Sequence, residues 1–261
     1  MKTGFLQFSP VFGEKQQNLM TVREMLHGVE ADVIVLPELF STGYAFLNKQ
    51  ELAGLAEPVQ GETLQFMHGL AQERNCAFAY GFCEKTADGF YNSMAFVTPR
   101  GLAATYRKSH LFFEEKFLFK RGDTGFDVLE YKGVKFGMLI CWDWIYPEAM
   151  RTLALKGSQV ILHAANLVTP YCPDAMVTRA IENRVFVITA DRCGDEVRGE
   201  KNFHFIGKSQ IVAPNAQILA RCGEEKCVRV MEIDPAMAMD KKITIHNDLM
   251  AERRPELYFK S

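Results

Sequence analysis

The 261-residue sequence lacks long apolar runs, an excess of one charge and a recognisable targeting segment, and each absence argues against a class of protein. The longest apolar runs, such as residues 33–37, are far too short to cross a bilayer, so we expect no membrane partner. Lysine and arginine total 30 against 32 acidic residues, a balance that argues against nucleic acid as a partner. The first ten residues carry one charged side chain and a brief apolar stretch, which argues against a secretory signal and favours a cytoplasmic location.

Patterns that bind metals or phosphates are also missing. The seven cysteines are odd in number and form no C-x-x-C pair, so we expect neither a zinc ribbon nor a thioredoxin-type site, and free thiols are the simplest interpretation. The six histidines show no metal-ligand spacing. Residues 207–209 read Gly-Lys-Ser, but position 202 is Asn where a phosphate-binding loop requires Gly. We therefore expect no metal and no organic cofactor.

The chain has no internal repeat, low-complexity tract or flexible linker, so we predict one domain over residues 1–261. Apolar residues at helical spacing and continuous β-branched runs indicate alternating helices and buried strands. We predict helices over 14–30, 62–75, 147–157 and 174–184, and strands over 3–8, 32–37, 76–83, 91–98, 134–140, 159–163 and 185–190. Strands cluster again within 203–233, and the whole order favours an α/β fold with mixed sheets.

Two reactive side chains stand where buried strands are predicted to end. Glu38 follows the run 32–37, and apolar surroundings would raise its pKa toward the range of a general base. Cys141 follows the strand 134–140 and precedes a helix that begins at Pro147, a strand-to-helix turn that favours a nucleophile. Each has an ordinary alternative, because Glu38 could turn outward into solvent and a buried free cysteine is often inert.

A third segment, residues 106–123, mixes charges with aromatic rings. It could be a solvated loop, or a loop that carries catalytic charge and lines a pocket. The ammonium of Lys108 could stabilise the oxyanion of a tetrahedral intermediate, and a cysteine needs a nearby base such as Glu38 for activation. The three segments could therefore act as one unit.

These segments, in this order, resemble the Glu-Lys-Cys triad of the nitrilase superfamily of carbon–nitrogen hydrolases. Glu38 stands in Pro-Glu-Leu-Phe-Ser-Thr-Gly-Tyr, Lys108 in Tyr-Arg-Lys-Ser-His-Leu-Phe and Cys141 in Ile-Cys-Trp-Asp. Many members carry a second glutamate seven residues before a Gly-Asp pair, and Glu115 satisfies that spacing to residues 122–123. Further similar blocks lie at 91–93, 179–183 and 207–211, so the resemblance covers nearly the whole chain.

The resemblance implies a four-layer α-β-β-α sandwich with two mixed sheets that pairs across a two-fold axis. It implies that Glu38 is the general base, Lys108 the oxyanion-stabilising lysine and Cys141 the nucleophile, with Glu115 orienting Lys108 or the substrate. The residues from about 234 to 261, of mixed charge with scattered apolar side chains, would form a C-terminal arm that reaches the partner of a homodimer. A disordered tail is the alternative for this stretch.

Some positions depart from the family pattern. Asp191 stands where many relatives have Asn. Ala216 follows Asn215 where a turn glycine is usual, so we expect Asn215 to adopt the left-handed conformation. Residues 168–173 vary between subfamilies and leave the substrate open.

The resemblance implies hydrolysis of a non-peptide carbon–nitrogen bond through a thioester, with release of ammonia. We expect a small aliphatic amide or ω-amide, because aromatic residues gather near Cys141. The expected oxyanion and substrate-binding residues are Trp142, Tyr44, Phe112 and Asn166. An N-carbamoyl amine hydrolase or a nitrilase of the same superfamily is the alternative within this chemistry. A glutaminase subunit of an amidotransferase and a catalytically silent binding protein are the alternatives of another class.

Overall fold

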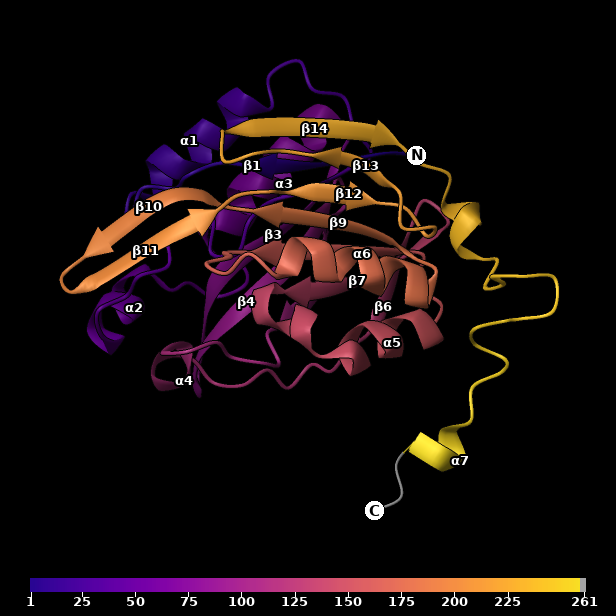
Figure 1. The fold of residues 1–261 in the computed structure, drawn as a ribbon. Coiled ribbons are helices and arrows are strands. Elements are labelled where there is room, and N and C mark those ends of the chain that lie inside the picture. Colours follow the sequence, from indigo (N-terminus) through magenta and orange to yellow (C-terminus); the bar gives the residue numbers. More distant parts are fainter. Residues whose placement is uncertain (259–261) are drawn as a thin grey trace.

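The computed structural model describes residues 1–258, and its centre is a pair of six-stranded mixed β-sheets (Figure 1). In the first sheet the order is β14-β1-β2-β3-β4-β5, with β1, β2 and β3 parallel and the other neighbours antiparallel. Its strands are β1 (Lys2–Gln7), β2 (Val33–Val35), β3 (Ala77–Thr86), β4 (Gly89–Thr98), β5 (Gly101–Arg107) and β14 (Cys227–Glu232).

The second sheet repeats this plan, with three parallel strands at its centre and antiparallel strands outside. Its order is β13-β12-β9-β8-β7-β6, and β7, β8 and β9 are the parallel strands. The strands are β6 (Val128–Tyr131), β7 (Val134–Ile140), β8 (Val160–Ala165), β9 (Phe186–Asp191), β12 (Gln210–Val212) and β13 (Ile218–Arg221). A separate hairpin of β10 (Cys193–Arg198) and β11 (Lys201–Ile206) projects beyond the sheets on the left of Figure 1.

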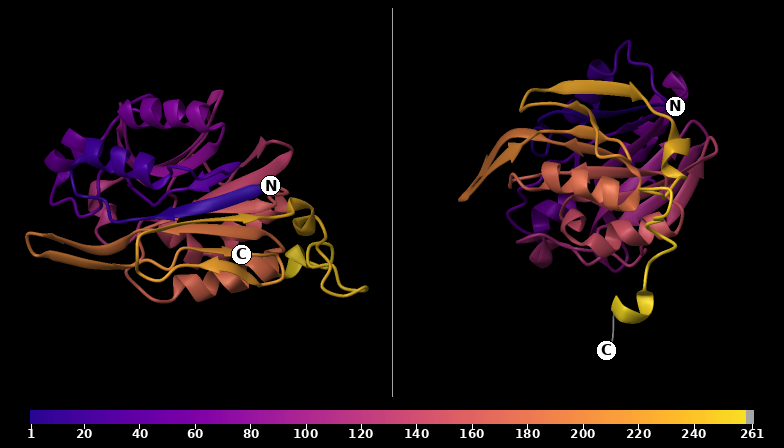
Figure 2. Two further views of the ribbon diagram at one scale, coloured as in Figure 1. Left: turned by 90° about the horizontal axis from the view of Figure 1, so that it is seen from above. Right: turned by 45° about the vertical axis from the view of Figure 1, so that its right-hand side comes forward.

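Helices cover the outer faces of both sheets, so the chain forms four layers (Figure 2). The helices α1 (Lys15–Met25) and α3 (Glu62–Arg74) lie on the first sheet, and α5 (Pro147–Leu155) and α6 (Cys172–Asn183) lie on the second. The shorter helices are α2 (Lys49–Leu55), α4 (Glu115–Leu118), η1 (Cys141–Ile145), η2 (Pro235–Ala238) and α7 (Pro255–Tyr258). The predicted α-β-β-α sandwich with two mixed sheets is confirmed. Among residues 1–258, no helix has the length and apolar content that a bilayer crossing requires.

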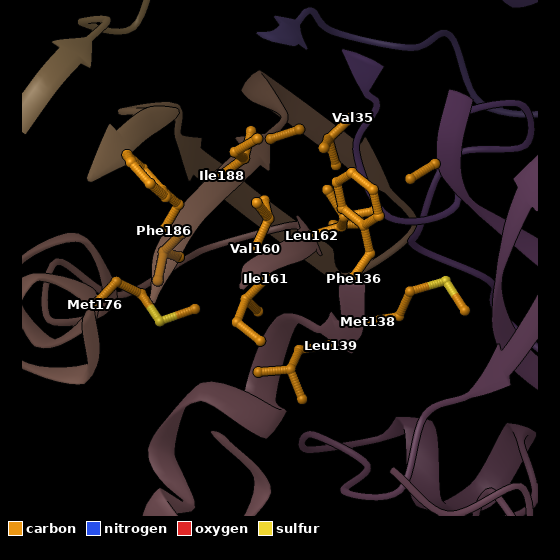
Figure 3. Close-up of a cluster of buried hydrophobic side chains, with 14 of the residues drawn as sticks. Val35, Phe136, Met138, Leu139, Val160, Ile161, Leu162, Met176, Phe186 and Ile188 are labelled. Atoms are coloured by element: carbon orange, nitrogen blue, oxygen red, sulfur yellow. The ribbon is translucent and has the colours of Figure 1, made fainter. Parts of the chain in front are cut away.

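The alternation of side chains along each strand explains why two layers of core form. Val33 and Val35 of β2 point into the core between the sheets, whereas Ile34 between them packs with the helix layer. Figure 3 shows Val35 of the first sheet beside Phe136 and Leu162 of the second. Because both faces of the central strands are covered, their sequences read as continuous apolar runs.

Two local expectations were wrong. Cys222 and Cys227 are joined by a disulfide, because the short turn between β13 and β14 brings them together; the other five cysteines are free and buried. The left-handed residue of the turn at 213–217 is Ala216, with φ of 69°, rather than Asn215. The amide of Ala216 donates to the carbonyl oxygen of Ala213 at 3.0 Å, so the left-handed position falls on the residue that follows the first turn.

Candidate active site

Three predicted catalytic residues lie within three residues of the ends of strands, at one edge of the fold. Glu38 lies three residues beyond β2, Lys108 follows β5 and Cys141 follows β7. Ligands in α/β sheets bind outside the carboxyl ends of parallel strands, and these positions lie there. Glu38, Lys108 and Cys141 are buried, with exposed fractions of 0%, 1% and 5%.

The ammonium of Lys108 lies between two carboxylates. Its Nζ donates to Oε1 of Glu38 at 2.6 Å and to Oε1 of Glu115 at 2.8 Å. Burial alone would lower the pKa of Lys108, but the two carboxylates outweigh it and raise that pKa above its usual value. Lys108 is therefore a fixed cation at neutral pH.

Glu38 has the environment of a general base. Burial raises its pKa to about 7, although the charge of Lys108 acts in the opposite direction. Its Oε1 accepts from Lys108 and also from Nδ2 of Asn92 at 2.6 Å. Its Oε2 is buried and has no hydrogen-bond partner among residues 1–258, so this oxygen is available to take a proton.

Cys141 begins the short helix η1 with φ of 41°, a left-handed conformation that is costly for a residue other than glycine. The thiol of Cys141 lies 3.8 Å from the carbonyl oxygen of Asn166. The backbone carbonyl oxygen of Cys141 lies 3.1 Å from Nε2 of His163. Burial and the charge of Glu38 raise the pKa of the Cys141 thiol well above its usual value. The free thiol is therefore neutral and needs a base to react.

Glu115 and its neighbour Glu114 differ in their surroundings. Glu115 is buried, and its Oε1 accepts from the hydroxyl of Tyr44 at 2.8 Å in addition to Lys108. Its Oε2 accepts from the amide of Phe112 at 3.1 Å, which closes the turn into α4. Glu114 instead pairs with Lys201 of β11 at 2.6 Å, outside the cluster.

The predicted substrate-binding residues lie around this cluster. The rings of Phe112 and Trp142 are 5.0 Å apart, and Tyr44 packs edge-to-face on Phe203 at 5.5 Å. The side-chain amide of Asn166 is buried, and both of its polar atoms lack a partner among residues 1–258. A narrow cavity of only about 10 Å³ lies between Glu115 and the hairpin, lined by Tyr44, Ala45, Phe113, Glu114, Glu115, Leu118, Phe119, Lys201 and Phe203.

Asn92 is a residue of the site whose role could not be predicted from the sequence. It donates to Glu38 through its side chain, and its backbone carbonyl accepts from the amide of Lys108 at 2.8 Å. It therefore contacts two charged members of the cluster, Glu38 and Lys108. Its position in β4, on the neighbouring strand to β5, is visible only once the strand register is known.

Two glycines allow the backbone to approach the charged residues closely. A Cβ on Gly81 of β3 would lie 2.6 Å from the Cα of Glu38. A Cβ on Gly122 would lie 2.0 Å from the carbonyl oxygen of Arg107, and the amide of Gly122 donates to the carbonyl of Lys108 at 2.8 Å. The Gly-Asp pair that follows Glu115 by seven residues is thus explained by packing against the Lys108 segment.

The two arginines of the 179–184 segment donate hydrogen bonds to backbone carbonyl oxygens outside the cluster. Arg179 pairs with Glu182 at 2.9 Å and donates to the carbonyl of Trp144 at 3.3 Å. Arg184 donates to the carbonyls of Asp240 and Pro214. The contacts of both arginines are therefore to Glu182 and to backbone carbonyls, not to the Cys141 side chain.

Similarity to known proteins identifies the family of this chain. Residues 2–242 match the family model described as carbon-nitrogen hydrolase. The chain belongs to this family. It is 43% identical over 265 residues to a nitrilase of Pyrococcus abyssi, with 100% of both chains covered. It is 36% identical over 208 residues to an (R)-stereoselective amidase of Pseudomonas sp., with 78% of this chain and 74% of the amidase covered.

The fold of this carbon–nitrogen hydrolase is shared with solved structures of the nitrilase superfamily. An amidase from Nesterenkonia sp. AN1 superposes with a TM-score of 0.82, covering 98% of this chain and 95% of that chain at 23% identity. That structure is of a variant with the acetamide moiety of fluoroacetamide added covalently at its active-site cysteine. The suspected resemblance to the nitrilase superfamily is confirmed.

Proposed function

We propose that this carbon–nitrogen hydrolase cleaves small aliphatic amides or ω-amides through a thioester on Cys141. The observation that carries the proposal is the buried Lys108 ammonium held between Glu38 and Glu115 at the strand ends where Cys141 also stands. A base with a pKa of about 7, a fixed cation and a neutral thiol are the three groups that acyl transfer to sulfur requires.

In the first half of the reaction Glu38 takes the thiol proton, and Sγ of Cys141 forms a bond to the amide carbon. The carbonyl oxygen becomes an oxyanion that Lys108 and the backbone N–H of Trp142 stabilise. When the tetrahedral intermediate collapses, Glu38 returns the proton to the nitrogen. Ammonia leaves, the thioester remains and Glu38 is again a carboxylate.

In the second half Glu38 takes a proton from water, whose oxygen attacks the thioester carbon. Lys108 stabilises the second oxyanion as it did the first. The bond to sulfur then breaks, Glu38 returns its proton to Cys141, and the carboxylic acid leaves. Glu115 orients Lys108 throughout, and Tyr44 orients Glu115.

The surroundings of the cluster support a compact acyl group and, of the two proposed amide classes, favour the uncharged aliphatic amides. The cavity beside Glu115 is narrow and bordered by the rings of Tyr44 and Phe203. The cation on its lining, Lys201, is already engaged by Glu114 at 2.6 Å and by the carbonyl of Phe46 at 2.7 Å. Arg179 and Arg184 hold backbone elsewhere, so a substrate carboxylate would find no free cation among these residues.

A substrate panel tests the class. We would compare kcat/KM for propionamide, a dicarboxylic acid monoamide, propionitrile and an N-carbamoyl amino acid, scoring ammonia release without ATP or an added acceptor. We expect one of the two amides to exceed the nitrile and the carbamoyl compound by about tenfold or more, which corresponds to about 1.4 kcal/mol in the barrier. The opposite order by the same factor would contradict the amide assignment.

Nitrile hydrolysis is the second candidate, favoured by the nitrilase of Pyrococcus abyssi at 43% identity. Attack on a nitrile gives a thioimidate, which needs one additional water before the thioester forms. A panel in which propionitrile is the best substrate would select this candidate. Failure of all four compounds would favour the glutaminase subunit or the silent binding protein instead.

A further inference from the structure

A buried carboxylate next to the nucleophile joins the Lys108 segment to the Cys141 turn. Asp143 is fully buried within η1. Its Oδ1 accepts from the backbone amide of His110 at 3.1 Å and from Nδ1 of the same residue at 2.7 Å. Its Oδ2 accepts from the hydroxyl of Tyr106 at 2.7 Å and from the amide of Ile140 at 3.0 Å.

The donors flank the two reactive residues closely. Tyr106 and His110 stand two residues before and two residues after Lys108, and Ile140 directly precedes Cys141. One carboxylate therefore holds both sides of the lysine to the turn that carries the thiol. Because a carboxylate only accepts hydrogen bonds, the imidazole must carry a proton on Nδ1 to complete the set.

Further contacts fix the donors themselves. The ring of His110 stacks on Tyr146, at the end of η1, with centroids 3.7 Å apart and planes within 15°. The hydroxyl of Tyr106 accepts from the amide of Ser109 at 3.2 Å, which closes the turn that contains Lys108. A fully hydrogen-bonded buried network of this kind is rigid, because each member has few other places to point.

We propose that Asp143 is a positioning residue that sets the Lys108 ammonium against the Cys141 thiol during the proposed reaction. This inference rests on the proposed function, because it gives Asp143 a role only if Lys108 and Cys141 act together. Asp143 touches neither the substrate nor the reacting atoms. It acts through the backbone on either side of them, and reacting groups displaced by about 1 Å can lose about 100-fold in rate.

The test replaces one carboxylate oxygen by an amide nitrogen. In Asp143→Asn the new amide group would face the backbone N–H of His110 or of Ile140, which cannot accept a hydrogen bond, so the segment must shift. We expect kcat to fall by about 10- to 100-fold, with KM changed by less than about threefold, because substrate contacts remain while the lysine is displaced. The rate at which iodoacetamide alkylates Cys141 should fall as well, a readout that loss of stability alone would not produce in folded protein.

His110 supplies a paired test, because an Asn side chain presents an amide N–H close to where Nδ1 stands. His110→Asn should therefore keep most of the wild-type kcat, whereas His110→Ala should lose about as much as Asp143→Asn. The matched control is the exposed pair of Asp195 and His204 on the β10–β11 hairpin, whose Oδ1–Nδ1 distance is also 2.7 Å. Asp195→Asn should leave kcat unchanged.

Tyr106→Phe covers the case in which Asp143→Asn does not fold. It removes one donor from the network and should lower kcat by about three- to tenfold at unchanged KM. Wild-type kcat in folded Asp143→Asn, or in both Tyr106→Phe and His110→Ala, would overturn the inference. Failure of the proposed function looks different, because the wild-type protein itself would then release no ammonia from either amide in the panel, whereas failure of this inference leaves wild-type turnover intact.

Discussion

Lys108 is the residue on which the electrostatics of the site depend. It is the only cation that contacts Glu38 or Glu115 within residues 1–258, at 2.6 and 2.8 Å, and all three side chains are buried. Burial removes the solvation of both carboxylates. Without Lys108 they would also repel each other, with no positive charge to compensate. The same ammonium is therefore required for the stability of the cluster and for oxyanion stabilisation.

Replacing Lys108 by Met keeps an unbranched side chain only one atom shorter and removes the charge. We expect kcat to fall by at least about 10²–10³, the loss typical of a missing oxyanion donor. We also expect about 3–5 kcal/mol of lost stability, because two buried carboxylates are left without a cation. Turnover is to be measured at a temperature where circular dichroism shows the variant folded. A loss in kcat below tenfold under those conditions would assign Lys108 a supporting role.

The pKa of Glu38 predicts the acid side of the pH profile. The base must be ionised to take the thiol proton, and burial raises its pKa to about 7. We therefore expect kcat/KM to be highest above pH 7 and to fall about tenfold per pH unit below it. A half-maximal point below about pH 5 would show that Glu38 keeps an ordinary carboxyl pKa and would contradict the burial argument.

At the residue scale, the sequence predicted which residues form the buried cluster but not the contacts that hold them in place. Glu38, Lys108, Cys141 and Glu115 were found because their motifs resemble a family, and spacing separated Glu115 from Glu114. The contacts of Asn92 and Asp143 could not be predicted, because each joins segments far apart in the chain. The sequence around a buried Asn or Asp does not indicate which distant residue it will contact.

At the element scale, strand register and close backbone approach place the site. Val134–Ile140 was predicted with its exact bounds, since a continuous apolar run ends at the polar turn after it. The strand β2 is only Val33–Val35, shorter than the predicted 32–37, because the chain leaves the sheet to present Glu38. The hairpin was missed in part, because β10 lies outside every predicted strand and only the end of β11 falls within the predicted stretch 203–233.

Gly81 offers a test of how tightly β3 holds the Glu38 turn. In Gly81→Ala the new methyl group would meet backbone atoms, the Cα of Glu38 at 2.6 Å and the amide nitrogen of Leu39 at 2.7 Å. We expect about 1–3 kcal/mol of lost stability and a fall in kcat of more than tenfold, because the backbone that carries the base must move.

Gly69 in α3 is the matched control for this substitution. A Cβ there meets no atom within 4 Å, and the residue lies in a helix. Gly69→Ala should therefore raise stability by about 0.5–1 kcal/mol without a change in kcat. Equal kcat values in the two variants would show that the contact between Gly81 and Glu38 does not matter for the reaction.

At the scale of the whole molecule, the C-terminal arm is the part of the chain that extends away from the four-layer body. Beyond η2 the chain runs away from the body of the protein to α7 (Figure 1), and residues 259–261 of the predicted arm lie outside the described part. Lys241 holds the start of the arm, since its Nζ donates to the carbonyls of Asn183 and Arg184 at the end of α6. The exposed large apolar side chains of the described part of the arm are Met237, Met239, Ile243, Ile245, Leu257 and Tyr258.

We predict a homodimer in which this arm contacts the partner subunit. Exposed apolar side chains on an extended segment gain stability when a second chain covers them. Light scattering at micromolar concentration should give twice the chain mass of 29.6 kDa. A variant that ends at residue 242 should shift toward monomer, and a monomeric mass for the full chain would contradict the prediction.

The most direct test of the proposed mechanism is to trap the acyl-enzyme. Wild-type protein mixed with a good amide substrate is quenched in acid, digested and examined by mass spectrometry. We predict an added mass equal to that of the substrate minus ammonia, located on the peptide that contains Cys141 and absent from the Cys141→Ala variant. An adduct on a different cysteine, or substrate turnover by Cys141→Ala, would contradict the assignment of Cys141 as the nucleophile.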